Sequence, residues 1–132
     1  MNGSIKENIK NITFCNSYEK EKYENVVSAC ALLKDFHEMD SADQTEIGER
    51  GVSLSGGQKQ RISLSRCVYE DRDIYLLDDP LSSLDNQVAD HLIKHVLSDD
   101  GQLKNKSRIA VGHNVSLLKE AVSITCVQML LK

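Results

Sequence analysis

A run of small and polar residues, LSGGQKQR at positions 54–61, has the composition of a phosphate-binding turn. Ser55 is a preferred N-cap residue, and the two glycines after it carry no Cβ atom, so another molecule can approach the main chain closely. The first N–H groups of such a helix point outward with the positive end of the helix dipole, which favours a phosphate. These residues alone leave open the alternative of an ordinary capped helix after a glycine loop.

Two adjacent carboxylates, Asp78 and Asp79, follow a short apolar run at residues 74–77. Parallel sheets bind ligands at their carboxyl edge, and a carboxylate pair there is costly without a cation or a reacting proton. We therefore expect Asp78 to hold Mg²⁺, directly or through water, and Asp79 to face an attacking water. A polar strand end in solvent is the alternative. His113 follows a second apolar run, residues 109–111, where an imidazole is able to donate to a phosphate oxygen.

The elements that must position these groups alternate along the second half of the chain. Helices are predicted from Ser55 to about Tyr69 and over about residues 86–97, the second capped by Asp85. Residues 74–77 are apolar at every position, which predicts a strand buried on both faces. Residues 109–111 and a stretch between 122 and 131 are predicted as further strands. This order predicts an α/β fold with crossover connections.

The first half of the chain is polar and favours helices. Residues 40–53 are predicted as a loop because they combine Asp, Ser and Gly. Upstream of them, apolar residues recur at i, i+3, i+4, i+7 and i+8, which predicts one buried face of an amphipathic helix. These residues are Tyr23, Val26, Val27, Cys30 and Ala31.

Length and composition exclude several classes of protein. The 132 residues carry 16 Lys and Arg against 20 Asp and Glu, a net charge of −4, and suffice for one domain. The acidic balance and an aromatic content of 5% argue against nucleic acid as a partner. No apolar run approaches the roughly 20 residues that span a bilayer, so we expect no direct membrane insertion by this segment. Widely spaced cysteines without a CxxC motif predict reduced thiols; these are Cys15, Cys30, Cys67 and Cys126.

In this order and spacing, the motifs resemble the ATP-binding cassette (ABC) ATPase domain. LSGGQKQR looks like the signature motif, residues 74–78 like the Walker B strand, residues 83–85 like the D-loop and His113 like the switch histidine. The runs KYENVVSACALLKD, DQTEIGERGVSLSGGQKQRISLSR and DIYLLDDPLSSLD are similar to the first cassette of the multidrug-resistance-associated (C) subfamily of exporters. The resemblance covers nearly the whole chain and fades after about Asn114.

This resemblance implies a partial P-loop NTPase (RecA-like) parallel-sheet core with the ABC α-helical subdomain. Residues 1–70 would form the helical subdomain and end in the signature helix, and residues 71–132 would form the partial ATPase core. The family's Walker A loop, GxxxxGK[ST], and its Q-loop have no counterpart in these 132 residues. We therefore expect the C-terminal part of a cassette, at the cytoplasmic face of a membrane within a transporter, or soluble in the cytosol if expressed alone.

In the family, two cassettes pack head to tail, and each ATP lies between the Walker motifs of one and the signature of the other. The resemblance therefore implies ATP and Mg²⁺ as cofactors, with a second cassette and transmembrane domains as partners. Asp78 would bind Mg²⁺, while Asp79, where most of the superfamily has Glu as the general base, would act with His113 at this cassette's own site. The residues that would contact nucleotide are Leu54, Ser55, Gly56, Gly57, Gln58 and Asp85.

Other interpretations stay open at this stage. Without a P-loop, the chain could be a non-hydrolysing module that docks on a partner cassette. A soluble ABC ATPase of the chromosome-maintenance kind is a third interpretation, but those proteins resemble LSGGE more and carry long coiled coils. His91 and His95 are spaced as a metal pair, although a solvated helix face is the default for them. Unpaired apolar strands predict poor solubility of the isolated chain.

Overall fold

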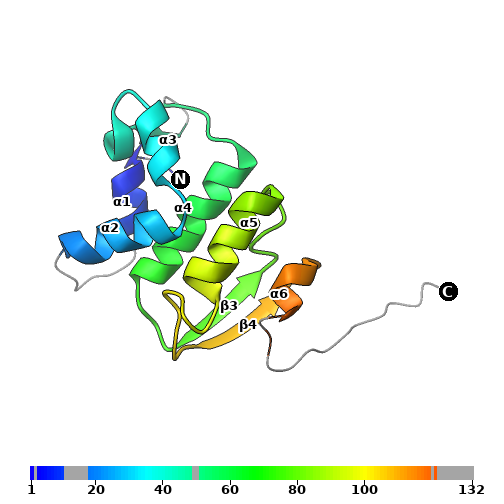
Figure 1. The fold of residues 1–132 in the computed structure, drawn as a ribbon. Coiled ribbons are helices and arrows are strands. Elements are labelled where there is room, and N and C mark those ends of the chain that lie inside the picture. Colours follow the sequence, from blue (N-terminus) through cyan, green and yellow to red (C-terminus); the bar gives the residue numbers. More distant parts are fainter. Residues whose placement is uncertain (2, 11–17, 49–50, 120, 122–132) are drawn as a thin grey trace.

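The computed structural model describes residues 1, 3–10, 18–48, 51–119 and 121. Helices and strands are mixed along the chain, so the predicted α/β class is confirmed (Figure 1). The predicted strand between residues 122 and 131, together with Cys15 and Cys126, lies outside the described residues. The elements are β1 (Gly3–Ser4), α1 (Ile5–Lys10), α2 (Lys20–Ala29), α3 (Leu33–Glu38), η1 (Ala42–Gln44), β2 (Glu46–Ile47), α4 (Gly56–Tyr69), β3 (Ile74–Asp78), α5 (Asn86–Leu92), η2 (Ile93–Leu97), β4 (Ser107–Val111) and α6 (Val115–Lys119).

The predicted amphipathic helix in the first half is α2. Its inward face is confirmed, because Tyr23, Val26 and Val27 are all buried. The helix ends at Ala29, and Cys30 follows as a fully buried C-cap residue. Ala31 was predicted on the same face but lies outside the helix, with a left-handed φ of 54° that turns the chain toward α3.

The prediction of a plain loop over residues 40–53 is wrong in part. A short 3₁₀ turn, η1, and the two-residue strand β2 lie within it. β2 pairs with β1 in an antiparallel ladder, Gly3 opposite Ile47 and Ser4 opposite Glu46. The pairing joins segments that are far apart in the chain, and two-residue strands carry no periodic pattern that a sequence could reveal.

The core of the second half is a parallel pair of strands, β3 and β4, joined by α5 and η2 (Figure 1). The predicted burial of β3 on both faces is wrong: Tyr75 and Leu77 are buried, whereas Ile74 and Leu76 are 63% and 74% exposed. The predicted strand at residues 109–111 is longer, Ser107–Val111. Its residues Ile109 and Val111 are exposed, as Ile74 and Leu76 of β3 are. Helices cover only one face of the pair, and no described element covers the other.

The predicted helix over residues 86–97 is confirmed in extent. Its first half is α5, and its last five residues form the π-helical turn η2. The N–H of Ser98 donates to the carbonyl oxygen of Ile93 at 2.7 Å, five residues back, which is the π-helical spacing. One face of this helix is buried, and it includes Ala89, Leu92 and Val96.

Buried apolar side chains from both halves form one cluster. Ile5 and Ile62 belong to it, as do Leu92 and Leu103 from beyond residue 70. Helix α4 lies at the centre and packs against α1 and α2. The division of the chain at residue 70 stays a prediction, since this cluster is continuous across it.

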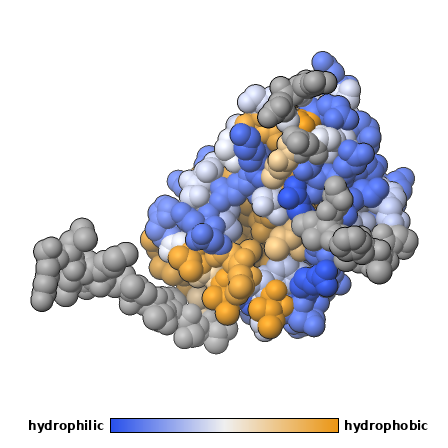
Figure 2. Space-filling model, turned by 180° about the vertical axis from the view of Figure 1, so that it is seen from behind, coloured by the Kyte–Doolittle hydropathy of each residue, from blue (hydrophilic) through white to orange (hydrophobic). Residues whose placement is uncertain are grey.

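One face of the molecule is strongly apolar. Seen from behind, Figure 2 shows hydrophobic side chains gathered at the lower end, where β3 and β4 lie. The residues are Ile74, Leu76, Ile109 and Val111, each more than half exposed. We call this set the open sheet face.

Candidate functional site

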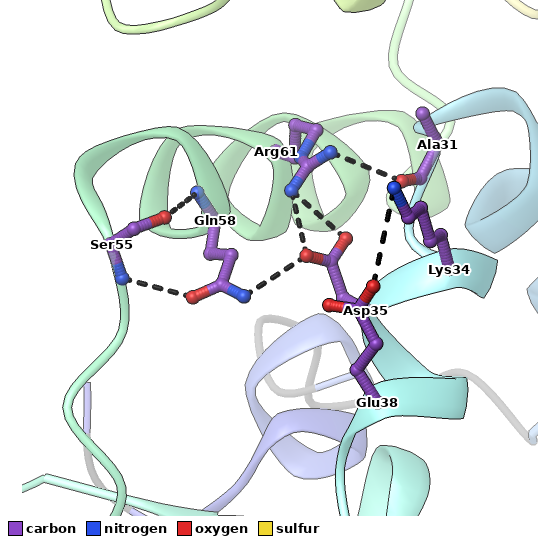
Figure 3. Close-up of polar contacts among 7 residues, drawn as sticks. All are labelled: Ala31, Lys34, Asp35, Glu38, Ser55, Gln58 and Arg61. Carbon is purple, nitrogen blue, oxygen red and sulfur yellow. Dashed lines mark hydrogen bonds and ion pairs between the residues drawn. The ribbon is translucent and has the colours of Figure 1, made fainter.

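The turn at residues 54–58, which we call the signature turn, is built around the N-terminus of α4. Ser55 is the N-cap, as predicted, and its Oγ accepts a hydrogen bond from the N–H of Gln58 at 3.2 Å. In return, the Oε1 of Gln58 accepts the N–H of Ser55 at 2.9 Å (Figure 3). This reciprocal pair is a capping box, and it fixes the main chain of the first helical turn. Leu54, just before it, is buried and anchors the turn in the core.

The two glycines of the signature turn differ in what surrounds them. A Cβ atom on Gly56 would lie 3.6 Å from Ser83, an ordinary contact, whereas a Cβ atom on Gly57 would lie 3.0 Å from the carbonyl oxygen of Ser83. Gly57 therefore has an internal packing reason to be glycine. The described part of the chain supplies no acceptor for the N–H groups of either glycine, so both donors stay open to a ligand.

Asp79 and His113 lie together at the carboxyl edge of the β3–β4 pair. Asp79 follows β3 with a left-handed φ of 43°, and its N–H donates to the carbonyl oxygen of Val111 at 2.7 Å. His113 comes two residues after β4, and its Nδ1 lies 3.3 Å from Oδ1 of Asp79. The carboxylate is thus within reach of an imidazole that is itself 79% exposed. A carboxylate and an imidazole at this separation are able to share or relay a proton.

Asp78 is the last residue of β3, and it is exposed. Mg²⁺ in nucleotide sites keeps several waters and takes one or two protein carboxylates, so an accessible strand-end carboxylate fits the predicted role. Among the described residues, no group of three or more His, Cys, Asp and Glu side chains is arranged to hold a metal by itself. The role of Asp78 in binding Mg²⁺ therefore stays a prediction.

The space beside Asp78 is small. A pocket of about 160 Å³ is lined by Asp78, Gln60, Cys67 and Leu76, among other residues. Sites that enclose small molecules run to about 300–1,000 Å³. The described part of the chain therefore does not enclose a nucleotide on its own at this edge.

Asp85 is the N-cap of α5, as predicted from the sequence. Its Oδ1 accepts the N–H of Val88 at 3.0 Å, and the side chain is exposed. One carboxylate oxygen is thus committed to the cap, and the other faces solvent. Its predicted contact with nucleotide stays a prediction.

Gln60, which joins α4 to the turn after β3, was not expected from the sequence. Its Nε2 donates to the carbonyl oxygen of Asp79 at 2.7 Å, and its Oε1 accepts the N–H of Ser83 at 3.0 Å. Asp35 was not expected either, and its side chain meets that of Arg61 between α3 and α4. Gln60 lies two positions after Gln58, the glutamine of the capping box. That position alone does not reveal that its side chain contacts Asp79 and Ser83.

His91 and His95 lie away from these groups, in a pocket of about 400 Å³ between α2, α5 and residues 100–104. Their ring centroids are 4.3 Å apart, and Nε2 of His91 lies 3.3 Å from the carbonyl oxygen of Ser28. Burial lowers the pKa of His95, and the neighbouring His91 and Lys94 lower it further. No third metal ligand accompanies the pair among the described residues.

The chain is similar to known transporters along most of its length. The sequence model of the ABC transporter family matches residues 2–82. The chain is 46% identical over 123 residues to ATP-binding cassette sub-family C member 2 of Mus musculus, covering 93% of this chain and 8% of that protein. It is 48% identical over 111 residues to sub-family C member 3 of Homo sapiens, covering 84% of this chain and 7% of that protein.

A yeast protein shows the same relationship. Metal resistance protein YCF1 of Saccharomyces cerevisiae is 49% identical over 124 residues, which is 94% of this chain and 8% of that protein. The chain thus spans less than a tenth of the length of these relatives. None of the helices among the described residues combines the length and the hydropathy needed to cross a bilayer.

Proposed function

This chain belongs to the ABC transporter family, and from that membership we propose that it forms part of a nucleotide-binding cassette of a subfamily C exporter. The identity of about half to subfamily C proteins supports the choice of subfamily. The observation that carries the proposal is the capped signature turn, which leaves two main-chain donors open at the N-terminus of α4. ATP and Mg²⁺ are the proposed cofactors, and the cytoplasmic face of a membrane is the proposed location.

The signature turn would serve an ATP held by a second cassette. Its open N–H groups, on Gly56 and Gly57, lie at the positive end of a 14-residue helix, which suits the γ-phosphate. The hydroxyl of Ser55 accepts from Gln58 and retains its own proton for a phosphate oxygen. Transmembrane domains, driven by closure of the two cassettes, are the second proposed partner.

The strand-end groups would serve this cassette's own nucleotide. Asp78 would hold Mg²⁺, which neutralises charge on the phosphates when it is bound. Asp79 would accept a proton from water while His113 holds its carboxylate in place. Asp is shorter than Glu by one C–C bond, about 1.5 Å, and a displacement of that size can cost on the order of 100-fold in rate. We therefore propose a slow site.

A non-hydrolysing docking module is the second candidate function. It is favoured by the 160 Å³ pocket beside Asp78 and by the lack of a GxxxxGK[ST] sequence in the 132 residues. The P-loop supplies most of the grip on the β- and γ-phosphates. The purified chain is therefore expected to show no Mg²⁺-dependent ATP turnover. Detectable turnover would contradict this expectation.

The test of the cassette function uses the yeast relative as a host. The aligned 124-residue segment of that protein is exchanged for this chain, and ATP turnover and site-resolved nucleotide trapping are measured. Ser55→Arg should abolish trapping at the opposite site, whereas Asp79→Glu should raise turnover at this cassette's own site. Asn25→Arg, an exposed position on α2, is the control. Both effects at one and the same site would refute the assignment.

A further inference from the structure

Asp35 on α3 is a buried carboxylate that reaches the signature turn from outside α4 (Figure 3). The residue is 8% exposed, and its Oδ1 accepts a hydrogen bond from Nε2 of Gln58 at 3.0 Å. The same oxygen accepts from Nη2 of Arg61 at 2.9 Å. Asp35 thus ties together the third and sixth residues of α4, 23 and 26 positions away in the sequence.

The charge of Asp35 is compensated by Arg61. Nη2 of Arg61 lies 2.9 Å from each carboxylate oxygen, and Nη1 donates to the carbonyl oxygen of Ala31 at 3.2 Å. The side chains of Arg61 and Asp35 are nearly buried, at 12% and 11% exposed. A buried ion pair of this kind adds little net stability but is costly to break from one side, so it fixes geometry more than it adds stability.

The orientation of the Gln58 amide follows from Asp35. A carboxylate only accepts hydrogen bonds, so it can face only the NH₂ end of the amide. The oxygen end is thereby turned toward the N–H of Ser55, which it accepts at 2.9 Å. The N–H of Ser55 thus donates within the protein, whereas the N–H groups of Gly56 and Gly57 stay available to a ligand.

We propose that Asp35 is a positioning residue of the signature turn: by selecting one orientation of the Gln58 amide, it determines which main-chain donors face the nucleotide. The proposal rests on the proposed function of this turn. Asp35 touches no reacting group and acts only through Gln58. A glutamate in place of Gln58 would face Asp35 with a second carboxylate instead of a donor, and repulsion between the two would draw its oxygen away from the N–H of Ser55.

The experiment is a double-mutant cycle on positions 35 and 58, read by deuterium exchange of single amides in the full chain at micromolar concentration. Asp35→Asn and Gln58→Glu should each speed exchange of the Ser55 amide roughly threefold to tenfold, as expected for loss of one hydrogen bond. The double variant reverses donor and acceptor, because the new amide at position 35 would donate to the new carboxylate at position 58. Its exchange should return to within about twofold of the parent.

Controls separate positioning from general loss of structure. The amide of Val88 also donates to a capping side chain, that of Asp85, but it lies outside the Asp35 cluster, so its exchange should stay unchanged in all three variants. Additive effects of the two single substitutions, with no recovery in the double variant, would overturn the proposal. Equal acceleration at Val88 would also overturn it, since Asp35 would then only stabilise the fold.

The yeast chimera adds a functional readout. Each single variant should lower kcat severalfold with little change in KM, and the double variant should recover, because the donors are misdirected rather than lost. One outcome would contradict the proposed function alone. In it, the double variant restores amide exchange, but ATP turnover of the chimera changes neither in these variants nor in Ser55→Arg. Unaltered exchange in the single variants would contradict the positioning role of Asp35 alone.

Discussion

The side-chain amide of Gln60 donates a hydrogen bond of 2.7 Å to the main-chain carbonyl oxygen of Asp79. The other end of the amide accepts the N–H of Ser83, so one side chain of α4 holds both ends of the turn after β3. Asp79 adopts a left-handed φ that non-glycine residues rarely adopt, and such a conformation persists only where its surroundings hold it. The helix that begins with the signature turn therefore also aims the strand-end carboxylate.

Gln60→Glu is expected to lower the free energy of unfolding by about 1–3 kcal/mol, because a carboxylate oxygen would face the carbonyl oxygen of Asp79 without a donor. Urea unfolding measures the effect. Gln102→Glu makes the same chemical change at an exposed position and should alter stability by less than about 0.5 kcal/mol. Equal losses in the two variants would show that the Gln60 bridge has no special importance.

Threonine at Leu76 and Ile109 is expected to reduce self-association of the chain. The two residues pair across β3 and β4, and they are 74% and 61% exposed on the open sheet face. Threonine has the β-branched shape that strands favour, and it removes apolar surface at both positions. Sedimentation velocity and binding of a hydrophobic dye measure the change. Ser107→Thr, in the same strand as Ile109, is the control, and unchanged association of the double variant would contradict the role of this face.

His95 should make the protein less stable in mild acid. Burial, His91 and Lys94 lower its pKa, so between the folded value and about 6.5 the unfolded chain binds more protons than the folded one. Stability therefore rises as the pH rises through this window, and the penalty is complete below the folded pKa. Urea midpoints of the parent and His95→Gln at about pH 5 and pH 8 test this: the variant should gain relative to the parent only at the lower pH. His37→Gln on α3 is the control.

Cys67 should react with a thiol reagent before Cys30 does. Burial raises the pKa of the Cys30 thiol strongly, and burial together with Glu70 raises the pKa of the Cys67 thiol. Cys30 is fully buried, whereas Cys67 is partly exposed, so only Cys67 offers access to the reactive thiolate. Mass spectrometry of a Cys15→Ser, Cys126→Ser background at about pH 8 measures both rates. Equal rates in the absence of urea would refute the prediction.

The sequence predicted the local features of the site well. Ser55 and Asp85 were expected as N-caps from residue type and position alone, and both accept the expected main-chain N–H. The meeting of Asp79 and His113 also follows from sequence, because the carboxyl ends of parallel strands lie at one edge. Their chemical roles stay predictions.

Long-range polar contacts could not be predicted. Gln60 and Asp79 are 19 positions apart, and Asp35 and Arg61 are 26 apart. A single polar residue carries no periodic signal, so its partner is not visible before the chain is folded. The burial of β3 was wrong for a different reason: four successive apolar residues predict two covering layers, but the described chain provides one.

Glycine at position 57 allows the first turn of α4 to lie in close contact with the turn that follows β3. Ser83 sits so close to Gly57 that even a methyl group there would have to push its carbonyl back by a few tenths of an ångström. Ser83 in turn belongs to the turn clamped at Asp79. A displacement imposed on one end of this assembly is thus transmitted to the other by direct steric contact. A substitution at position 57 should accordingly be tolerated only if the main chain at Ser83 shifts with it.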